Sequence, residues 1–100
     1  MPNSLSKKLI SETLGTCIFL GVIITVVNDR TSTVNWLKIG LALSTVIVLF
    51  GNISGGNFNP AVSFMLFLNN QLSSTELFSY IIAQMVGALL AYYIFMNVTK

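Results

Sequence analysis

The chain has 100 residues, of which 54% are hydrophobic and only 8% are charged, against about 25% charged in an ordinary soluble domain, so the composition favours a protein that lies in a lipid bilayer. The formal net charge of +2 is too small for a nucleic-acid-binding surface, and the absence of histidine excludes a histidine-ligated metal site. We therefore expect an integral membrane protein with no cofactor, no metal and no nucleic-acid partner.

The first predicted membrane span covers residues 9–27, an apolar stretch interrupted by Glu12 and by small hydroxyl side chains. A spanning helix needs about 20 residues. Lys7 and Lys8 precede the span, as in a secretory signal peptide, but no A-x-A-like cleavage site follows and an acidic residue lies inside, so we expect the segment to be retained. The single cysteine, Cys17, rules out an intrachain disulfide, and we expect it to pack as a small apolar residue.

Two further spans are predicted after the first. A polar loop, NDRTST, leads to residues 36–51, which begin at Trp36, a residue typical of membrane interfaces. A second polar loop, NNQLSS, leads to residues 75–98, and Ser73 with Glu76 forms the S-x-x-E pattern of a capping box at the start of this span. As a helix the third span would be about 36 Å long, enough to cross a bilayer at a tilt.

A polar break separates the second and third spans. Residues 52–68 contain the turn-forming sequence SGGNFNP and then an apolar stretch, PAVSFMLFL, that is too short to cross a membrane. This stretch would form about 13 Å of helix, roughly half of a ~30 Å hydrocarbon core. We expect a re-entrant segment that reaches the middle of the membrane and returns to the same side. Since irregular backbone at that depth must be buried in protein or line a wet cavity, the break indicates a pore.

The residues of the break suit a half-helix whose N-terminus lies inside the membrane. Pro60 fits the first helical position and Asn59 the N-cap, while Gly55 and Gly56 allow other backbones to approach closely. The N-terminus would carry about half a positive charge, and the Asn59 amide is a hydrogen-bond donor. Together they suit neutral hydrogen-bonding solutes and repel cations. The alternative interpretation is an ordinary loop and a short interfacial helix, with no pore.

Two polar side chains inside the spans require partners. Glu12 has three interpretations: a proton-transfer or cation-binding group, an acceptor for backbone N–H groups of the loop, or a side chain that extends to the interface. Gln84 lies deeper, in the third span. Small residues on the first and third spans predict close helix packing. They are Gly15, Ala83, Gly87 and Ala91.

Three motifs stand in order along the chain: ISETLGT at residues 10–16, SGGNFNPAVSF at 54–64 and YIIAQMVGALLA at 80–91. Together they resemble the first half of the major intrinsic protein family of aquaporins and glycerol facilitators, namely its first-helix E-x-x-G-T signature, its Asn-Pro-Ala pore loop and its third helix. The resemblance covers residues 1–100 as one aquaporin-like half-channel. It implies an all-α membrane protein with three transmembrane helices and one re-entrant half-helix, which is half of an inverted-repeat fold.

The resemblance also implies roles for individual residues. Asn59 would donate to passing water or solute, and Pro60 with Ala61 would hold two such loops together where their half-helices meet at the midplane. Glu12 and Gln84 would brace the loop and not move protons. The pore-lining part of the loop would consist of Gly55, Gly56, Asn57 and Phe58.

Two positions depart from the family's pattern. Asn57 occupies the place of a histidine that is common in the family, which removes a titratable group but keeps the backbone contribution. Ile39, twenty positions before Asn59, is the candidate for the narrow filter, where the family often has an aromatic residue. An aliphatic side chain there leaves the choice between water and larger solutes open.

The resemblance further implies a second half of opposite orientation, with its own Asn-Pro-Ala triplet and a filter arginine; here Val62 follows the triplet. Three sources of that half stay open: the rest of a longer protein, a separate partner chain, or an antiparallel copy of this chain, so that a homo- or hetero-oligomer completes the pore.

The charged residues near the predicted spans give little information on membrane orientation. The family's orientation would place the N-terminus in the cytoplasm with two basic residues, and Arg30, Lys38 and Lys100 on the other side. This distribution has no inside bias and is compatible with insertion in both orientations.

We expect a multi-pass membrane protein, not an enzyme, that acts as a passive channel component for water or small neutral solutes such as glycerol. One alternative is a small dual-topology proton-coupled transporter, which would have four full spans. Another is a holin-like membrane protein, which would need neither the Asn-Pro-Ala loop nor Glu12.

Overall fold

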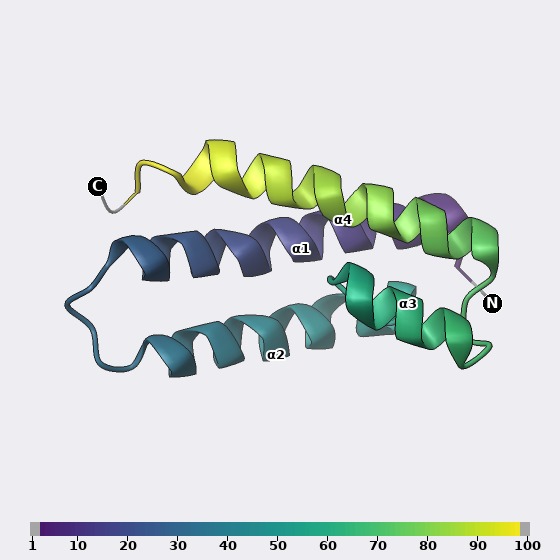
Figure 1. Cartoon of the computed structure of the whole chain (residues 1–100), viewed down its shortest axis with the longest axis horizontal. Coiled ribbons are helices and arrows are strands. Elements are labelled where there is room, and N and C mark those ends of the chain that lie inside the picture. The colour runs from purple at the N-terminus through teal and green to yellow at the C-terminus, as the bar shows by residue number, and fades with distance from the viewer. Residues whose placement is uncertain (1–2, 99–100) are drawn as a thin grey trace.

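In the computed structural model, which describes residues 3–98, the chain forms the helices α1 (Leu5–Asn28), α2 (Asn35–Ser54), α3 (Pro60–Leu68) and α4 (Ser74–Phe95), as Figure 1 shows. Three of them, α1, α2 and α4, are long and apolar enough to cross a membrane. The remaining helix, α3, has nine residues. The expected fold class of three spanning helices and one half-helix is therefore confirmed.

The first two helices extend beyond their predicted bounds. Helix α1 begins at Leu5 and not at residue 9, because the Ser4 hydroxyl accepts the Lys7 N–H at 3.3 Å and caps a polar first turn. Helix α2 continues to Ser54 and does not end at residue 51, so residues 52–54 belong to the helix and not to the loop. It ends where Gly55 takes a left-handed conformation with a φ of 93°.

Helix α4 has the capping box that its sequence predicts. The Ser73 hydroxyl accepts the Glu76 N–H at 3.1 Å, and the Glu76 carboxylate accepts the Ser73 N–H at 3.0 Å. The helix ends at Phe95, before the predicted end at residue 98. Lys100, one of the basic residues considered above for the orientation in the membrane, lies outside the described residues.

Helix α1 lies between α2 and α4 and packs against both, while α3 packs against α4. Gly87 permits the close approach of α4 to α1, since a Cβ at Gly87 would lie 2.6 Å from the Thr13 carbonyl oxygen. Ala83 and Ala91 are buried on the same helix. Gly15 serves a different contact, because its missing side chain makes room for the Phe58 ring and not for another helix.

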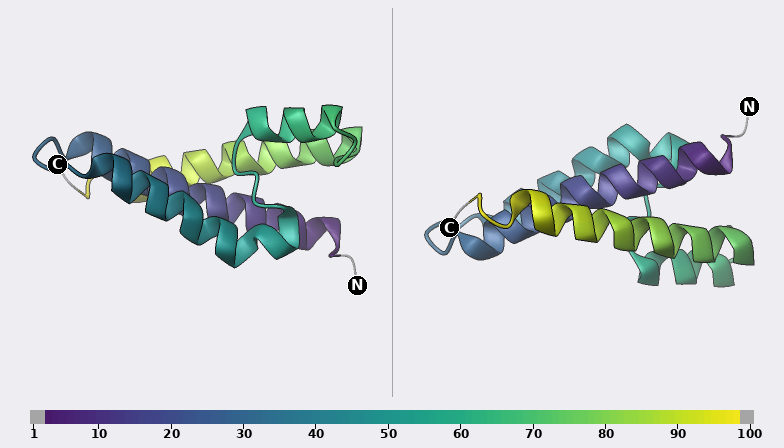
Figure 2. Two further views of the ribbon diagram at one scale, coloured as in Figure 1. Left: turned by 90° about the horizontal axis from the view of Figure 1, so that it is seen from below. Right: turned by 90° about the horizontal axis from the view of Figure 1, so that it is seen from above.

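The re-entrant path of the chain is visible in Figure 1. Helix α3 begins near the middle of the long helices and runs back toward the end of the bundle at which α2 ends. Figure 2 shows α3 lying along α4 and standing apart from α2. The half-helix therefore has its N-terminus near the middle of the length of the bundle, as expected for a segment that enters and leaves on one side.

Candidate pore site

The start of α3 is held by local hydrogen bonds. Asn59 is the N-cap, and its Oδ1 accepts the Ala61 N–H at 2.8 Å, while Pro60 occupies the first turn without needing a partner for a missing N–H. Among residues 3–98, the Nδ2 group of Asn59 donates to no acceptor. Asn59, Pro60 and Ala61 are all exposed. The cap thus uses the side-chain oxygen of Asn59 and leaves the N–H groups of its side-chain amide free.

The loop before α3 contains a series of left-handed residues. Gly55 and Gly56 have φ angles of 93° and 67°, and Phe58 has a φ of 53°. Glycine adopts this conformation without a steric penalty, whereas a bulky residue pays about 1–3 kcal/mol. The Phe58 ring is buried against Gly15 and makes an edge-on contact with Phe50, with ring centroids 6.3 Å apart. This packing holds Phe58 in its strained conformation.

Glu12 is the acceptor on which the loop converges. Its carboxylate is completely buried and accepts the backbone N–H groups of Asn57 at 3.1 Å and of Phe58 at 2.8 Å. It also accepts the Ser54 hydroxyl at 2.6 Å and the Gln84 amide at 2.9 Å. These four donors occupy both oxygens of the side chain, so the hydrogen-bonding capacity of this buried group is met by protein groups. The burial rules out the interpretation in which Glu12 extends to the interface.

A second layer of hydrogen bonds ties the loop to α3 and α4. The Ser63 hydroxyl is fully buried and accepts both the Asn57 side-chain amide at 2.9 Å and the Gln84 amide at 2.8 Å. Tyr80 donates its hydroxyl to the Ser54 carbonyl at 2.7 Å. The Asn57 side chain therefore points into the protein and links the loop to the half-helix.

Sequence reasoning did not single out Ser54, Ser63 or Tyr80. The available signal was a lone hydroxyl, Ser63, inside an otherwise apolar nine-residue helix.

Asn59 lies at the edge of an apolar cavity of about 420 Å³ between α1, α4 and the start of α3. Most of the wall is apolar, and its polar part comes from Asn59, Thr16 and Gln84. The filter candidate Ile39 lies half-buried on α2 and does not line this cavity. The structure therefore brings Asn59, Phe58 and Gln84 together but leaves Ile39 apart from them.

The profile of the family described as Major intrinsic protein matches residues 2–100. Among curated proteins, the chain is 38% identical over 87 residues to "Glycerol uptake facilitator protein-like 6" of Lactiplantibacillus plantarum, which covers 85% of this chain and 40% of the relative.

Two shorter matches carry the name aquaporin. The chain is 44% identical over 55 residues to "Aquaporin Z" of Photorhabdus laumondii, covering 55% of this chain and 24% of the relative, and 43% identical over 53 residues to "Aquaporin-5" of Homo sapiens, covering 53% and 20%. The chain thus spans 40% or less of the length of these relatives. Since the family profile matches nearly every residue, the chain belongs to the major intrinsic protein family.

Proposed function

We propose that residues 1–100 form one half of a passive channel for water and small neutral solutes such as glycerol. Members of this family are passive channels and not enzymes. The observation that carries the proposal is the free amide donor of Asn59, which lies at the N-terminus of a half-helix and borders an apolar cavity. The proton-coupled alternative, with four full spans, does not fit the three spanning helices in the described part of the chain.

The electrostatics at Asn59 favour neutral solutes over cations. The N-terminus of α3 concentrates a partial positive charge of about half an elementary charge, which repels cations at that point. A neutral solute loses hydrogen bonds to water on entering an apolar cavity, and the Asn59 amide replaces one of them. Glu12 has both oxygens engaged by loop and helix donors, so we assign it the role of holding the loop in place.

A second half would complete the pore. Asn59, Pro60 and Ala61 are exposed at mid-depth, where the polar start of a helix must be covered by protein or face water. A mate of opposite orientation would cover Pro60 and Ala61 and present a second donor to the solute. The rest of a longer protein, a partner chain or an antiparallel copy would each meet this need. The proposal also keeps the cytoplasmic N-terminus that the resemblance implies.

The Asn59→Asp variant tests the proposal in proteoliposomes. Aspartate is as good an N-cap as asparagine, so α3 keeps its start, but the free amide donor is replaced by a negative charge. We expect slower osmotic swelling by stopped flow and faster leakage of a monovalent cation. Asn69→Asp is the matched control, because Asn69 is the exposed C-cap of α3 and lies away from the cavity.

Two results would count against parts of the proposal. Unchanged swelling and cation leakage in Asn59→Asp would refute the role of Asn59. A lack of swelling with the purified chain alone would rule out an antiparallel copy as the second half, and swelling would then have to appear only with an added half.

A further inference from the structure

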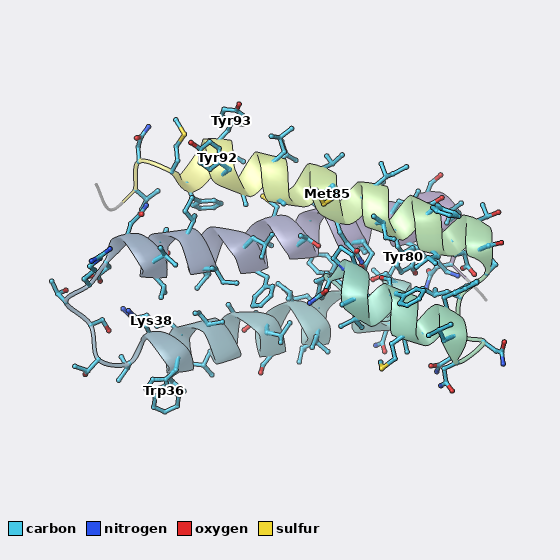
Figure 3. The ribbon with its side chains drawn as sticks, in the orientation of Figure 1. Trp36, Lys38, Tyr80, Met85, Tyr92 and Tyr93 are labelled. Atoms are coloured by element: carbon cyan, nitrogen blue, oxygen red, sulfur yellow. The ribbon has the colours of Figure 1, made fainter. Side chains whose placement is uncertain are left out.

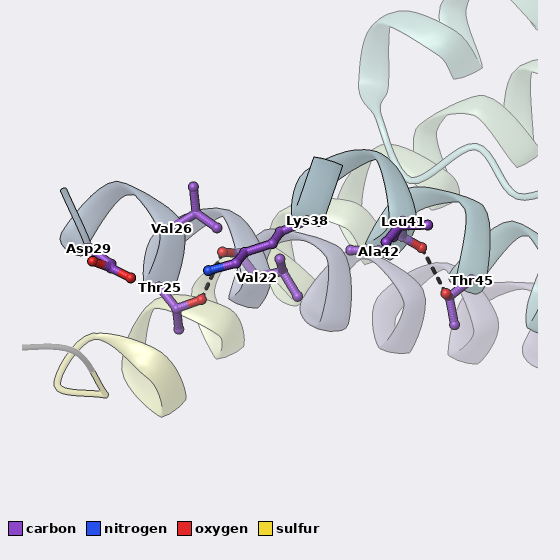
Figure 4. A pocket seen from close by; sticks show the side chains of 8 residues that line it. All are labelled: Val22, Thr25, Val26, Asp29, Lys38, Leu41, Ala42 and Thr45. Atoms are coloured by element: carbon purple, nitrogen blue, oxygen red, sulfur yellow. Dashed lines mark hydrogen bonds between the residues drawn. The ribbon is translucent and has the colours of Figure 1, made fainter. Parts of the chain in front are cut away.

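A second cavity lies between α1 and α2, at the end of the bundle that carries the loop between these helices. Its volume is about 430 Å³, and it shares no lining residue with the cavity beside Asn59. Its walls are mainly apolar, with Val22 and Val26 on α1 and Leu41 and Ala42 on α2. Two threonines also line it, Thr25 and Thr45, and each donates its hydroxyl to a carbonyl of its own helix. Figure 4 shows these side chains together with Asp29 and Lys38 at the mouth.

Opposite charges stand on the two sides of this mouth. Asp29 follows the last residue of α1, and Lys38 lies on α2, with its side chain extending toward α1 in Figure 4. Among the described residues, the only ion pair within 4.0 Å joins Lys8 Nζ and Glu76 Oε2, which are 3.1 Å apart. Asp29 and Lys38 therefore do not form an ion pair with each other. They leave an anionic and a cationic group facing one groove.

The Asp29 carboxylate is held in position as a charged group. Its Oδ1 accepts the Thr31 hydroxyl at 2.6 Å and the Thr31 N–H at 3.0 Å. These hydrogen bonds, with a smaller effect of the Lys38 charge, hold the pKa of the Asp29 carboxyl below its ordinary value. Within residues 3–98 the second carboxylate oxygen, Oδ2, accepts no hydrogen bond, so it is available to an outside donor.

Aromatic side chains place this end of the bundle at the level of lipid headgroups. Trp36 is 72% exposed and points away from the bundle, and Tyr92 and Tyr93 lie at the same end (Figure 3). Tryptophan and tyrosine are enriched where the hydrocarbon core meets the headgroups. The charged mouth therefore lies at headgroup depth, and the apolar walls below it lie at the depth of the acyl chains.

We propose that this groove binds a zwitterionic phospholipid whose headgroup carries a primary ammonium, of the ethanolamine type. Lys38 donates to the lipid phosphate, the lipid ammonium donates to Asp29, and one acyl chain follows Val22 and Leu41 between the two helices. A glycerol headgroup carries the same phosphate but no ammonium, so it would leave the Asp29 carboxylate without a cationic partner. A choline headgroup has no N–H group to donate. The inference is independent of whether the chain conducts.

Trp36, the only tryptophan of the chain, reports on the neighbouring lipid. The protein is reconstituted in phosphatidylcholine vesicles with a minor fraction of spin-labelled phospholipid, whose nitroxide is attached near the headgroup end of an acyl chain. The headgroup of the labelled lipid is ethanolamine, choline or glycerol. Because the mouth is exposed, water partly screens its charges, and we expect only a modest preference. The quenching of Trp36 should indicate about threefold stronger association of the ethanolamine lipid than of the choline or glycerol lipid.

Variants assign the preference to the two charges. Lys38→Gln removes the partner of the phosphate, which all three labelled lipids carry, and should lower the quenching of Trp36 by all three. Asp29→Asn removes the partner of the ammonium and should shift the preference toward the anionic glycerol headgroup. Arg30→Gln is the matched control, since Arg30 is an exposed cation in the loop between α1 and α2 that does not line the groove, and it should change neither the quenching nor the preference.

Equal quenching by the three headgroups in the unmodified chain would overturn the proposal, and this measurement does not depend on any variant folding. Quenching lowered equally by Arg30→Gln and by Lys38→Gln would also overturn it, because it would show a general attraction of lipid phosphate to positive charge. Far-UV circular dichroism confirms that each variant keeps its helices.

Discussion

Replacing Gly87 with alanine should push α4 away from α1. A Cβ at this position would lie 2.6 Å from the Thr13 carbonyl oxygen and 2.9 Å from the Thr16 Cβ. The carbonyl belongs to helix backbone, so it cannot rotate away, and relief requires the two helices to separate. Gly40 offers a matched comparison on α2, because a Cβ there meets nothing within 4 Å.

The two substitutions have opposite expected effects on stability. Each alanine gains up to about 1 kcal/mol of helix propensity over glycine. At Gly87 the overpacking costs about 1–3 kcal/mol, and this cost is absent at Gly40. We therefore expect Gly87→Ala to be less stable than Gly40→Ala by about 1–3 kcal/mol.

The measurement is reversible unfolding in mixed micelles by titration with sodium dodecyl sulfate, followed by far-UV circular dichroism. If Gly87→Ala were as stable as Gly40→Ala, the close packing of α1 on α4 would be refuted.

Three further substitutions test the hydrogen bonds around the loop and at the start of α4. Glu12→Gln replaces one acceptor oxygen with an NH2 group, so the N–H of Asn57 or of Phe58 would face a donor, at a cost of about 1–3 kcal/mol. Hydrogen exchange of these two backbone amides should become faster, and unchanged exchange would contradict the bracing role. Ser63→Ala removes the shared acceptor of two buried amides and should destabilise the protein by about 1–3 kcal/mol for each amide left unpaired, which detergent unfolding measures; a loss near zero would mean that other acceptors replace it. Ser73→Ala removes the N-cap of α4 and should cost about 1 kcal/mol in the same titration; no loss would show that the cap does not contribute.

The features that sequence predicted well are those determined by neighbouring residues. The half-helix occupies the apolar stretch Pro60–Leu68, because a proline at its first position and an asparagine N-cap are local signals. The capping box at Ser73 and Glu76 is local as well. The length of each apolar stretch was enough to give the number of spanning helices.

The features that sequence missed depend on contacts between distant residues. Helix α2 runs to Ser54 because the hydroxyl of that residue reaches Glu12, 42 positions earlier in the chain. Phe58 keeps its left-handed backbone conformation because its ring fits into the space left by the missing side chain of Gly15, a contact that no local sequence pattern reveals. The role of Ser63 as a shared acceptor depends on α3 lying against α4, a packing that the order of helices alone does not determine.

The most direct test of the central claim is the osmotic water permeability of proteoliposomes and its dependence on temperature, measured for the protein together with whichever second half completes it. A pore in which the Asn59 amide replaces a hydrogen bond to water predicts high permeability with a weak temperature dependence, and a marked loss of permeability in Asn59→Asp but not in Asn69→Asp. Permeability equal to that of empty liposomes, with the steep temperature dependence of diffusion through lipid, would contradict the account.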